Sequence, residues 1–159
     1  LMYASENGNH KIVDLLIELI RQKGELNDGV KDLFEWFRSK GLPMAVASSS
    51  DLRIINAVMD KFDIGGYFKV IHSAEFEEHG KPHPAIYLTT AKRLAVLPNE
   101  CLTIEDSLNG LRSATAAGMK TIAVPEAKLY SDAGFDDADL KLRSLAELNE
   151  EKFSELNSI

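Results

Sequence analysis

The sequence is poor in features that define several whole classes of protein. Cys101 is the single cysteine in 159 residues, so no disulfide can form within the chain, which is compatible with a reducing compartment. No apolar run approaches the roughly 18 residues that a membrane-spanning helix needs, and no signal peptide is visible. We therefore expect a cytoplasmic protein that has no membrane partner, with Cys101 packed as a small hydrophobic residue.

The chain also lacks an excess of positive charge. It has 18 Lys and Arg against 25 Asp and Glu, a formal net charge of −7, and no block of either sign. This balance argues against a nucleic-acid or anionic-membrane surface, so neither is expected as a partner. A hydrophobic fraction of 45% argues against disorder, and the length fits one domain or one domain with a fragment of another.

Apolar runs of strand type alternate with stretches of helical periodicity along the chain. The predicted strands are 43–47, 68–72, 101–104, 120–124 and a short edge strand at 139–142, and the predicted helices are 10–23, 30–40, 52–62, 84–95, 108–117 and 144–156. This alternation predicts an α/β protein, a Rossmann-like three-layer αβα sandwich with a mostly parallel sheet. Right-handed crossovers would place the carboxyl ends of all the strands on one edge.

Polar residues ahead of the apolar periodicity predict the helix starts. Asn9 and Asp28 are the expected N-caps of the first two helices, and Ser107 is the expected N-cap of the helix after residues 101–104. Asp51 or Ser50 would cap the helix at 52–62.

Polar side chains collect where three predicted strands end. Ser48 and Ser49 end one strand, Lys81 follows another by a loop, and Glu105 and Asp106 end a third. A hydroxyl and backbone amides at a helix start bind anionic oxygen, Lys is a compact charge suited to phosphate, and paired carboxylates suit Mg²⁺. Together they predict a phosphate and metal site. Each part also has a plain structural reading, as a helix cap, an exposed loop lysine or a solvated turn.

The spacing of other reactive residues predicts no further site. Those that could be imagined as zinc ligands do not fit a closed site: Glu78, His79, His83 and Cys101. No Ser-His-Asp set can be assembled from spacing. His72 has no evident partner and is expected to be structural.

Three segments resemble sequence motifs two, three and four of the haloacid dehalogenase superfamily: VASSS, GKPHP and TIEDSLNGLRSATAAGMKTIAVP. Within it the chain resembles the sugar-phosphate phosphatase and β-phosphoglucomutase-like subgroup, notably the 2-deoxyglucose-6-phosphate (hexitol) phosphatases, over roughly residues 25–150. A receiver-type signalling domain would place its acidic residues first and its Lys last, which is not the order here.

The resemblance implies a role for each matching residue. Ser48 would donate a hydrogen bond to the transferring phosphoryl group, with the Ser49 amide nearby. Lys81 would bridge the phosphate and the nucleophilic carboxylate. Asp106 would ligate Mg²⁺, and Glu105 would ligate it or hold a water on it.

The family's first motif has no counterpart in the chain. That motif, Asp-x-Asp after an apolar strand, supplies the nucleophile and the general acid/base. An Asp-x-Asp pattern does occur at Asp137-Ala138-Asp139, but it lies late in the chain and in a polar loop, so we do not assign it to catalysis. Leu1 is not an initiator Met, and we expect about 60 to 70 N-terminal residues to be absent, from the size of such domains.

The resemblance also implies a domain division. Residues 1–26 would be the C-terminal remnant of a helical cap, and residues 27–159 a Rossmann-like core without its first strand. That strand would lie between those that end at Ser48 and at Asp106, and its absence would leave backbone groups unpaired.

The expected activity is that of a Mg²⁺-dependent phosphatase of small phosphorylated sugars or polyols, acting through an aspartyl-phosphate. The expected partner is a small phosphorylated metabolite, and the expected state is a monomer. The 159-residue chain itself is expected to be inactive. The alternatives are a sugar phosphomutase of the same family, and a catalytically inactive truncated product or binding module.

Overall fold

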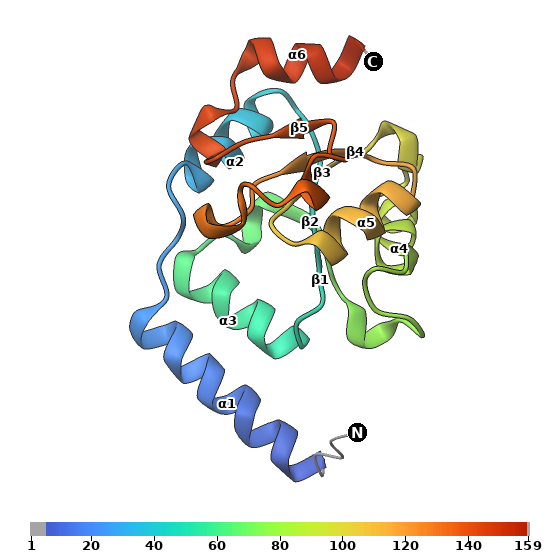
Figure 1. The fold of residues 1–159 in the computed structure, drawn as a ribbon. Coiled ribbons are helices and arrows are strands. Elements are labelled where there is room, and N and C mark those ends of the chain that lie inside the picture. Colours follow the sequence, from blue (N-terminus) through green and yellow to red (C-terminus); the bar gives the residue numbers. More distant parts are fainter. Residues whose placement is uncertain (1–5, 159) are drawn as a thin grey trace.

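The computed structural model describes residues 6–158, with side-chain surroundings for residues 10–156. Its helices and strands alternate as the periodicity predicts, in an α/β fold (Figure 1). In chain order they are α1 (Glu6–Lys23), α2 (Val30–Ser39), β1 (Met44–Ser48), α3 (Leu52–Phe62), β2 (Phe68–Ser73), α4 (Ala85–Leu94), β3 (Leu102–Glu105), α5 (Leu108–Ala116), β4 (Lys120–Ala123), β5 (Leu140–Lys141) and α6 (Glu150–Ser158). None of the described helices is both long enough and apolar enough to span a bilayer.

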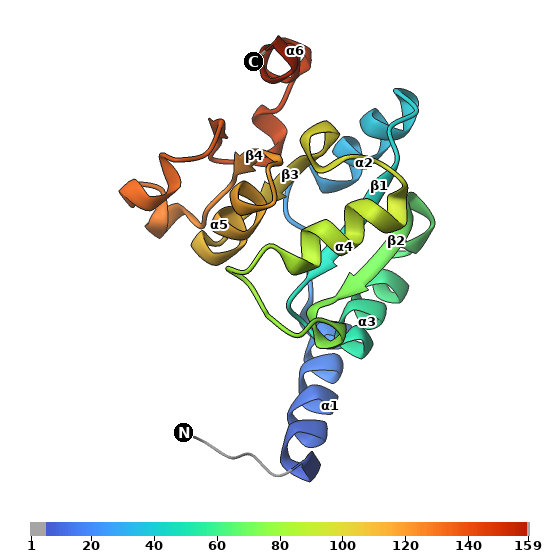
Figure 2. The same ribbon diagram turned by 90° about the vertical axis from the view of Figure 1, so that its right-hand side faces the viewer.

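The described strands form two parallel half-sheets. One pairs β1 with β2, and the other has the order β3-β4-β5. Helix α4 packs on β1 and β2, and α5 packs on β3 and β4 (Figure 2). Because every described pair is parallel, the carboxyl ends within each half-sheet share one edge.

A cavity of about 500 Å³ separates the two half-sheets, and we call it the inter-sheet cavity. Its lining is contributed by both facing strands and by the helices over them, including Leu33, Phe37, Ala45, Tyr87 and Ile104. Among residues 6–158, no strand pairs with the cavity side of β1 or of β3. The cavity therefore lies between the strands that end at Ser48 and at Glu105.

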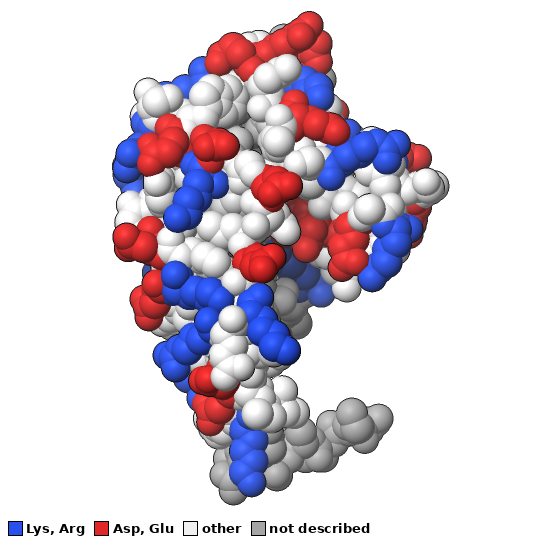
Figure 3. All heavy atoms as spheres, turned by 90° about the vertical axis from the view of Figure 1, so that its left-hand side faces the viewer, with Lys and Arg blue, Asp and Glu red and all other residues white. Residues whose placement is uncertain are grey.

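Helix α1 projects from the rest of the molecule and packs along α3 (Figure 1). The Nζ of Lys61 donates to the carbonyl of Ile20 at 2.6 Å, and Arg53 lies 3.7 Å from Asp14. The predicted apolar face of this helix is mostly exposed, at Ile12, Leu15, Leu16 and Leu19. Over the face in Figure 3, acidic and basic side chains are interspersed.

Two of the predicted helix caps are confirmed and two are wrong. The Asp51 side chain accepts from the Arg53 amide, and Ser107 Oγ accepts from the Gly110 amide at 3.1 Å. Asn9 lies inside α1, which already begins at Glu6. The residue before α2 is Gly29 and not Asp28; its φ is 83°, and a Cβ there would lie 2.9 Å from the Ala146 amide nitrogen. The close approach of a distant loop therefore decides this helix start.

The C-terminal segment is less helical than predicted. In place of one helix over 144–156 there is a short turn at Leu145–Glu147, and α6 begins only at Glu150. Leu148 is extended, and the Asn149 side chain accepts from the Lys152 amide at 3.0 Å, so Asn149 starts a new helix.

Cys101 differs from its prediction in a smaller way. It precedes β3 and is half-buried, where the sequence predicted a buried strand residue.

His72 has a structural role, as expected, with two partners that the sequence did not reveal. The side chain is 4% exposed on β2. Its Nε2 lies 2.6 Å from Glu77 Oε1, and its Nδ1 lies 2.9 Å from Arg93 Nη1. The hydrogen bond with His72 lowers the pKa of the Glu77 carboxyl below its usual 4.5. This contact ties the loop after β2 back to the strand.

Glu77→Gln is expected to lower the free energy of unfolding by about 1 to 2 kcal/mol at neutral pH, because a charged partner of a buried imidazole is lost. A lowered folded-state pKa stabilises the fold above pH 4.5, and that stability disappears as the pH falls through the folded-state value. Urea unfolding at several pH values should therefore show the two proteins converging below pH 4.5. The exposed neighbour gives the control Glu78→Gln, expected within about 0.5 kcal/mol of the parent. A pH-independent difference would contradict the assignment.

Candidate active site at the carboxyl edge

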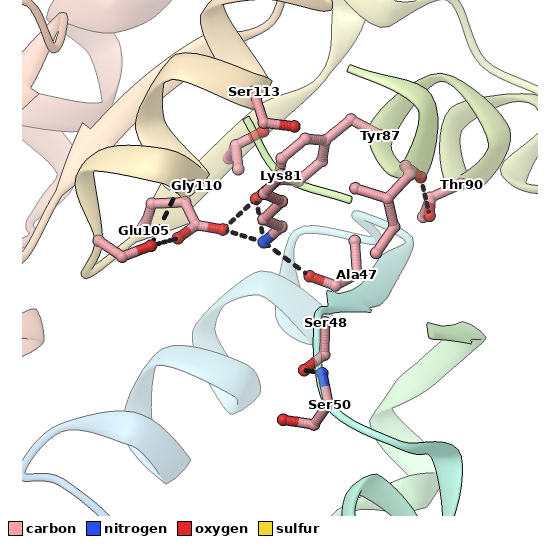
Figure 4. A network of polar contacts seen from close by, with 12 residues as sticks. Ala47, Ser48, Ser50, Lys81, Tyr87, Thr90, Glu105, Gly110 and Ser113 are labelled. Atoms are coloured by element: carbon pink, nitrogen blue, oxygen red, sulfur yellow. Dashed lines mark hydrogen bonds and ion pairs between the residues drawn. The ribbon is translucent and has the colours of Figure 1, made fainter. Parts of the chain in front are cut away.

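Lys81 lies between the two half-sheets at their carboxyl edge (Figure 4). Its Nζ donates to the Ala47 carbonyl of β1 at 3.1 Å and to the Tyr87 hydroxyl at 3.0 Å, and it lies 2.5 Å from Glu105 Oε1 of β3. The side chain is only 10% exposed. One ammonium group thus links both sides of the inter-sheet cavity.

The loop that carries Lys81 is held by its neighbours. The His83 amide donates to the Gly80 carbonyl at 3.0 Å, which closes a turn around Lys81. Ser113 Oγ of α5 donates to the His83 carbonyl at 2.7 Å. Pro84 then precedes the first residue of α4, in keeping with the predicted helix start. These contacts fix the backbone from which Lys81 reaches the sheet.

Glu105 is the last residue of β3 and has both carboxylate oxygens engaged. Oε1 accepts from Lys81 and from the Tyr87 hydroxyl, and Oε2 accepts from Ser107 Oγ at 3.3 Å. The residue is 9% exposed. Burial, followed by the negative charge of Glu105, raises the pKa of Tyr87 strongly, so its hydroxyl stays protonated and donates. This geometry makes Glu105 the anionic partner of Lys81.

Gly110 leaves the space that the Glu105 carboxylate fills. A Cβ added at this position would lie 1.8 Å from Glu105 Oε2, far inside any permitted contact. The backbone amide of Gly110 also donates to the capping oxygen of Ser107. The spacing from Glu105 through Ser107 to Gly110 therefore has a steric reason: the first turn of α5 must approach the carboxylate closely.

Asp106 differs sharply from its neighbour Glu105. It is exposed, and within residues 6–158 no hydrogen bond or ion pair engages its carboxylate. The described residues contain no cluster of three or more potential metal ligands. Mg²⁺ takes one or two protein carboxylates and completes its shell with water and phosphate oxygens. A free carboxylate beside the carboxyl edge fits part of such a shell.

Ser48 ends β1, directly after the residue whose carbonyl contacts Lys81. Its Oγ accepts from the Ser50 amide at 3.1 Å, which leaves the hydroxyl hydrogen free to donate to an anionic oxygen. Ser49 is exposed in the same turn. The amides of Leu52 and Arg53 at the start of α3 are taken by the carboxylates of Glu75 and Asp51. Anion binding at this helix start would therefore use the serine turn.

The structure brings the predicted residues Ser48, Lys81, Glu105 and Asp106 to one region, and two contributors were not predicted. Tyr87 lies in the predicted helix at 84–95, and the periodicity of that helix gives no sign that the Tyr87 hydroxyl contacts Lys81 and Glu105. A clue in the sequence is the spacing: Tyr87 follows Lys81 by six residues and so lies on the first turn of the next helix, close to the lysine. Gly110 ends the Glu-Asp-Ser-x-x-Gly part of the third matching segment, but the sequence assigned it no role.

Two groups of residues that the sequence analysis did not assign to a site lie apart from Lys81: the acidic residues around Asp139, and the histidines His79 and His83. Asp139 Oδ2 accepts from the Thr121 amide at 2.7 Å and from its hydroxyl at 2.9 Å, near the amino end of β4. That contact joins β4 to the edge strand and faces away from Lys81. The His79 and His83 rings lie 4.7 Å apart at the surface, with no metal-ligand cluster among the described residues.

Comparison with known proteins finds a matching hydrolase family and relatives that are phosphatases. A model of haloacid dehalogenase-like hydrolases matches residues 4–118. Hexitol phosphatase B of Escherichia coli K12 is 36% identical over 138 residues, which are 87% of this chain and 62% of that protein. The phosphorylated carbohydrates phosphatase of Thermotoga maritima is 34% identical over 96 residues, 60% of this chain and 44% of that protein.

Solved structures agree with the sequence matches. CbbY from Rhodobacter sphaeroides in complex with phosphate has a TM-score of 0.85 and 30% identity, over 93% of this chain and 68% of that one. β-Phosphoglucomutase from Clostridium difficile has a TM-score of 0.80 and 27% identity, over 96% of this chain and 65% of that one. The chain thus spans 62% of the hexitol phosphatase and similar shares of the structures. Because the family model covers most of its residues, the chain belongs to the haloacid dehalogenase-like hydrolases.

Proposed function

We propose that this chain is part of a Mg²⁺-dependent phosphatase that acts on small phosphorylated sugars or polyols. The observation that carries the proposal is the Lys81 ammonium, held by Ala47 and Glu105 where Ser48 and Asp106 also lie. The names of two relatives, a hexitol phosphatase and a phosphorylated carbohydrates phosphatase, support the substrate class.

Each residue has a distinct chemical role in this proposal. Ser48 donates its hydroxyl hydrogen to an oxygen of the phosphoryl group. Lys81 places positive charge beside that group and beside the attacking carboxylate, and Glu105 holds Lys81 in place. Asp106 is the metal ligand. When bound, Mg²⁺ supplies further positive charge that offsets the charge of the transferring phosphoryl group.

The proposed reaction has two displacements at phosphorus. A carboxylate oxygen bonds to phosphorus while the bond to the sugar oxygen breaks, which gives an aspartyl-phosphate and an alcohol that takes up a proton. Water then attacks phosphorus, releasing phosphate and regenerating the carboxylate. The nucleophile must stand within reach of Lys81, and we place it at the end of a strand in the inter-sheet cavity.

The domain division is part of the same proposal. We assign residues 27–159 to the α/β core and residues 1–26 to a helical cap. Support comes from α1, which packs along α3 but leaves the apolar side chains of Leu15 and Leu19 exposed. Exposed side chains of this size on one helix face suit contact with further protein.

Asp106→Asn is expected to reduce Mg²⁺-dependent phosphate release by about 100-fold or more in the natural protein that contains this chain, because a charged ligand becomes neutral. The measurement is phosphate release from hexose and hexitol phosphates over a range of Mg²⁺ concentrations. Asp137→Asn, a change at an exposed carboxylate that has no role in the proposal, is the control and should leave turnover unchanged. Normal Mg²⁺-dependent turnover in Asp106→Asn would overturn the metal assignment, and no release from any sugar or polyol phosphate would overturn the function.

The structural similarity to a β-phosphoglucomutase favours a second candidate function, transfer of phosphate between positions of one sugar. The two reactions share the residues above and differ in their products. Incubation with a hexose 1-phosphate would yield inorganic phosphate from a phosphatase and an isomeric sugar phosphate from a mutase.

A further inference from the structure

Strand β2 ends directly beside the serine turn, residues 48–50, which follows β1. The two strands are parallel, and their register pairs Ser48 with Ser73. Ser73 is 0% exposed, so its hydroxyl needs a partner within the protein. Its Oγ donates to the carbonyl of Ser50 at 2.7 Å. A side chain of the neighbouring strand thus holds the turn that carries Ser48.

The end of β2 holds this turn at two points. Ser73 Oγ accepts from the amide of Glu75 at 3.2 Å, so its own hydrogen is committed to the Ser50 carbonyl. The Glu75 side chain makes the second contact, because its Oε2 accepts from the amide of Leu52 at 2.8 Å. Ser73 and Glu75 therefore fix two successive peptide groups, which lie on either side of Asp51.

The effect of Ser73 reaches Ser48 through Ser50. The amide of Ser50 donates to Ser48 Oγ at 3.1 Å (Figure 4). The carbonyl of Ser50 accepts from Ser73, so both peptide groups that flank Ser50 are held. Since one lone pair of Ser48 Oγ faces the Ser50 amide, the hydroxyl hydrogen points away from it. The direction of the Ser48 hydroxyl thus depends on a residue of another strand.

The start of α3 makes this direction more important. Free amides at a helix start commonly bind anions, but the amides of Leu52 and Arg53 are already taken by carboxylates. The guanidinium of Arg53 in turn lies 3.1 Å from the carboxylate of Asp51. An anionic oxygen at the end of β1 therefore depends on the serine turn, and on where the Ser48 hydroxyl points.

We propose that Ser73 and Glu75 are positioning residues that hold the serine turn so that the Ser48 hydroxyl faces an anionic oxygen at the carboxyl edge. Both act through the backbone of the turn and not by contact with the phosphoryl group. The catalytic value of this arrangement rests on the proposed function, whereas the geometry of the turn does not.

Ser73→Ala removes the donor, and the test uses the natural protein that contains this chain. We expect kcat for hexitol phosphates to fall about tenfold with KM changed by less than about twofold, because a misdirected hydroxyl weakens a contact made in the transition state. Thr121→Val is the matched control, since the hydroxyl of Thr121 is also buried but bonds Asp139. It should change kcat by less than about twofold.

A double variant tests whether Ser73 acts through Ser48. If it does, Ser48→Ala combined with Ser73→Ala should be no slower than Ser48→Ala alone. A purely structural role of Ser73 would lower kcat further in the Ser48→Ala protein, and that result would overturn the proposal.

Glu75 is exposed, so its variants remain informative if Ser73→Ala does not fold. Glu75→Gln keeps an oxygen that can accept from the Leu52 amide, and kcat should stay within about twofold of the parent. Glu75→Leu removes that acceptor and should lower kcat about tenfold. Equal rates for the two variants would overturn the positioning role of Glu75.

Amide hydrogen exchange separates this inference from the proposed function. Ser73→Ala should speed exchange at the Ser50 amide about tenfold or more relative to Thr121→Val, because the turn opens more readily. If the parent releases no phosphate from any sugar or polyol phosphate, the proposed function fails, and faster exchange at Ser50 still supports the positioning of the turn. Unchanged exchange at Ser50 would overturn that positioning even if kcat falls.

Discussion

Gly110→Ala is expected to destabilise the protein by about 2 to 4 kcal/mol, although glycine-to-alanine changes inside helices ordinarily stabilise by about 1 kcal/mol. The added methyl group would lie 1.8 Å from Glu105 Oε2, so either the carboxylate or the first turn of α5 must move. Overpacking of this kind costs about 1 to 3 kcal/mol, and loosening a buried ion pair adds to it. Thermal and urea unfolding measure the change.

The matched control for this substitution is the preceding residue of the same helix. Asn109 is exposed, and Asn109→Ala should change the free energy of unfolding by no more than about 0.5 kcal/mol. If the carboxylate is the source of the clash, adding Glu105→Ala to Gly110→Ala should cost less than the two single changes together. An unaltered stability for Gly110→Ala would show that Glu105 lies elsewhere.

Lys81→Met is expected to cost about 3 to 5 kcal/mol of folding free energy, because it leaves the Glu105 carboxylate buried without its cation. The methionine keeps the length and apolar volume of the lysine stem, so lost packing contributes little. Urea denaturation of Lys81→Met, Glu105→Leu and the double variant forms a thermodynamic cycle. The double variant should recover part of the folding free energy lost in the single variants, because two apolar side chains cost less to bury here than one unpaired charge.

An exposed lysine of the adjacent helix provides the control for that cycle. Lys92→Met on α4 should change stability by no more than about 0.5 kcal/mol. Strict additivity of the Lys81 and Glu105 changes would refute the coupling between them. A retained coupling together with lost phosphate release would assign the pair to both the fold and the proposed reaction.

Much of the fold follows from local patterns that do not depend on distant contacts. Alternation of apolar runs and helical periodicity predicts each strand from β1 to β5, and hydroxyl or carboxylate caps predict the starts of α3 and α5. The start of α2 could not be predicted locally because it depends on a remote partner. Gly29 precedes α2, and a Cβ at that position would lie 2.9 Å from the amide nitrogen of Ala146, a residue far away in the chain.

The candidate site was predictable as a set of residues and not as a geometry. Glu105 and Asp106 give the same signal in the sequence, but successive side chains at a strand end point to opposite faces. One is therefore buried against Lys81 and the other is exposed. The hydroxyl of Tyr87 joins the site through its hydrogen bond to Glu105 at the end of β3, and periodicity alone shows only that this residue faces the core.

The division into half-sheets also bears on how the chain assembles. Strands β1 and β2 are joined through α3, and β3 and β4 through α5, so each parallel pair closes over a short stretch of chain. Shorter closures carry a smaller entropic cost than longer ones. We therefore expect each half to form as a local unit, and the contacts of Lys81 with Ala47 and Glu105 to form when the two halves dock.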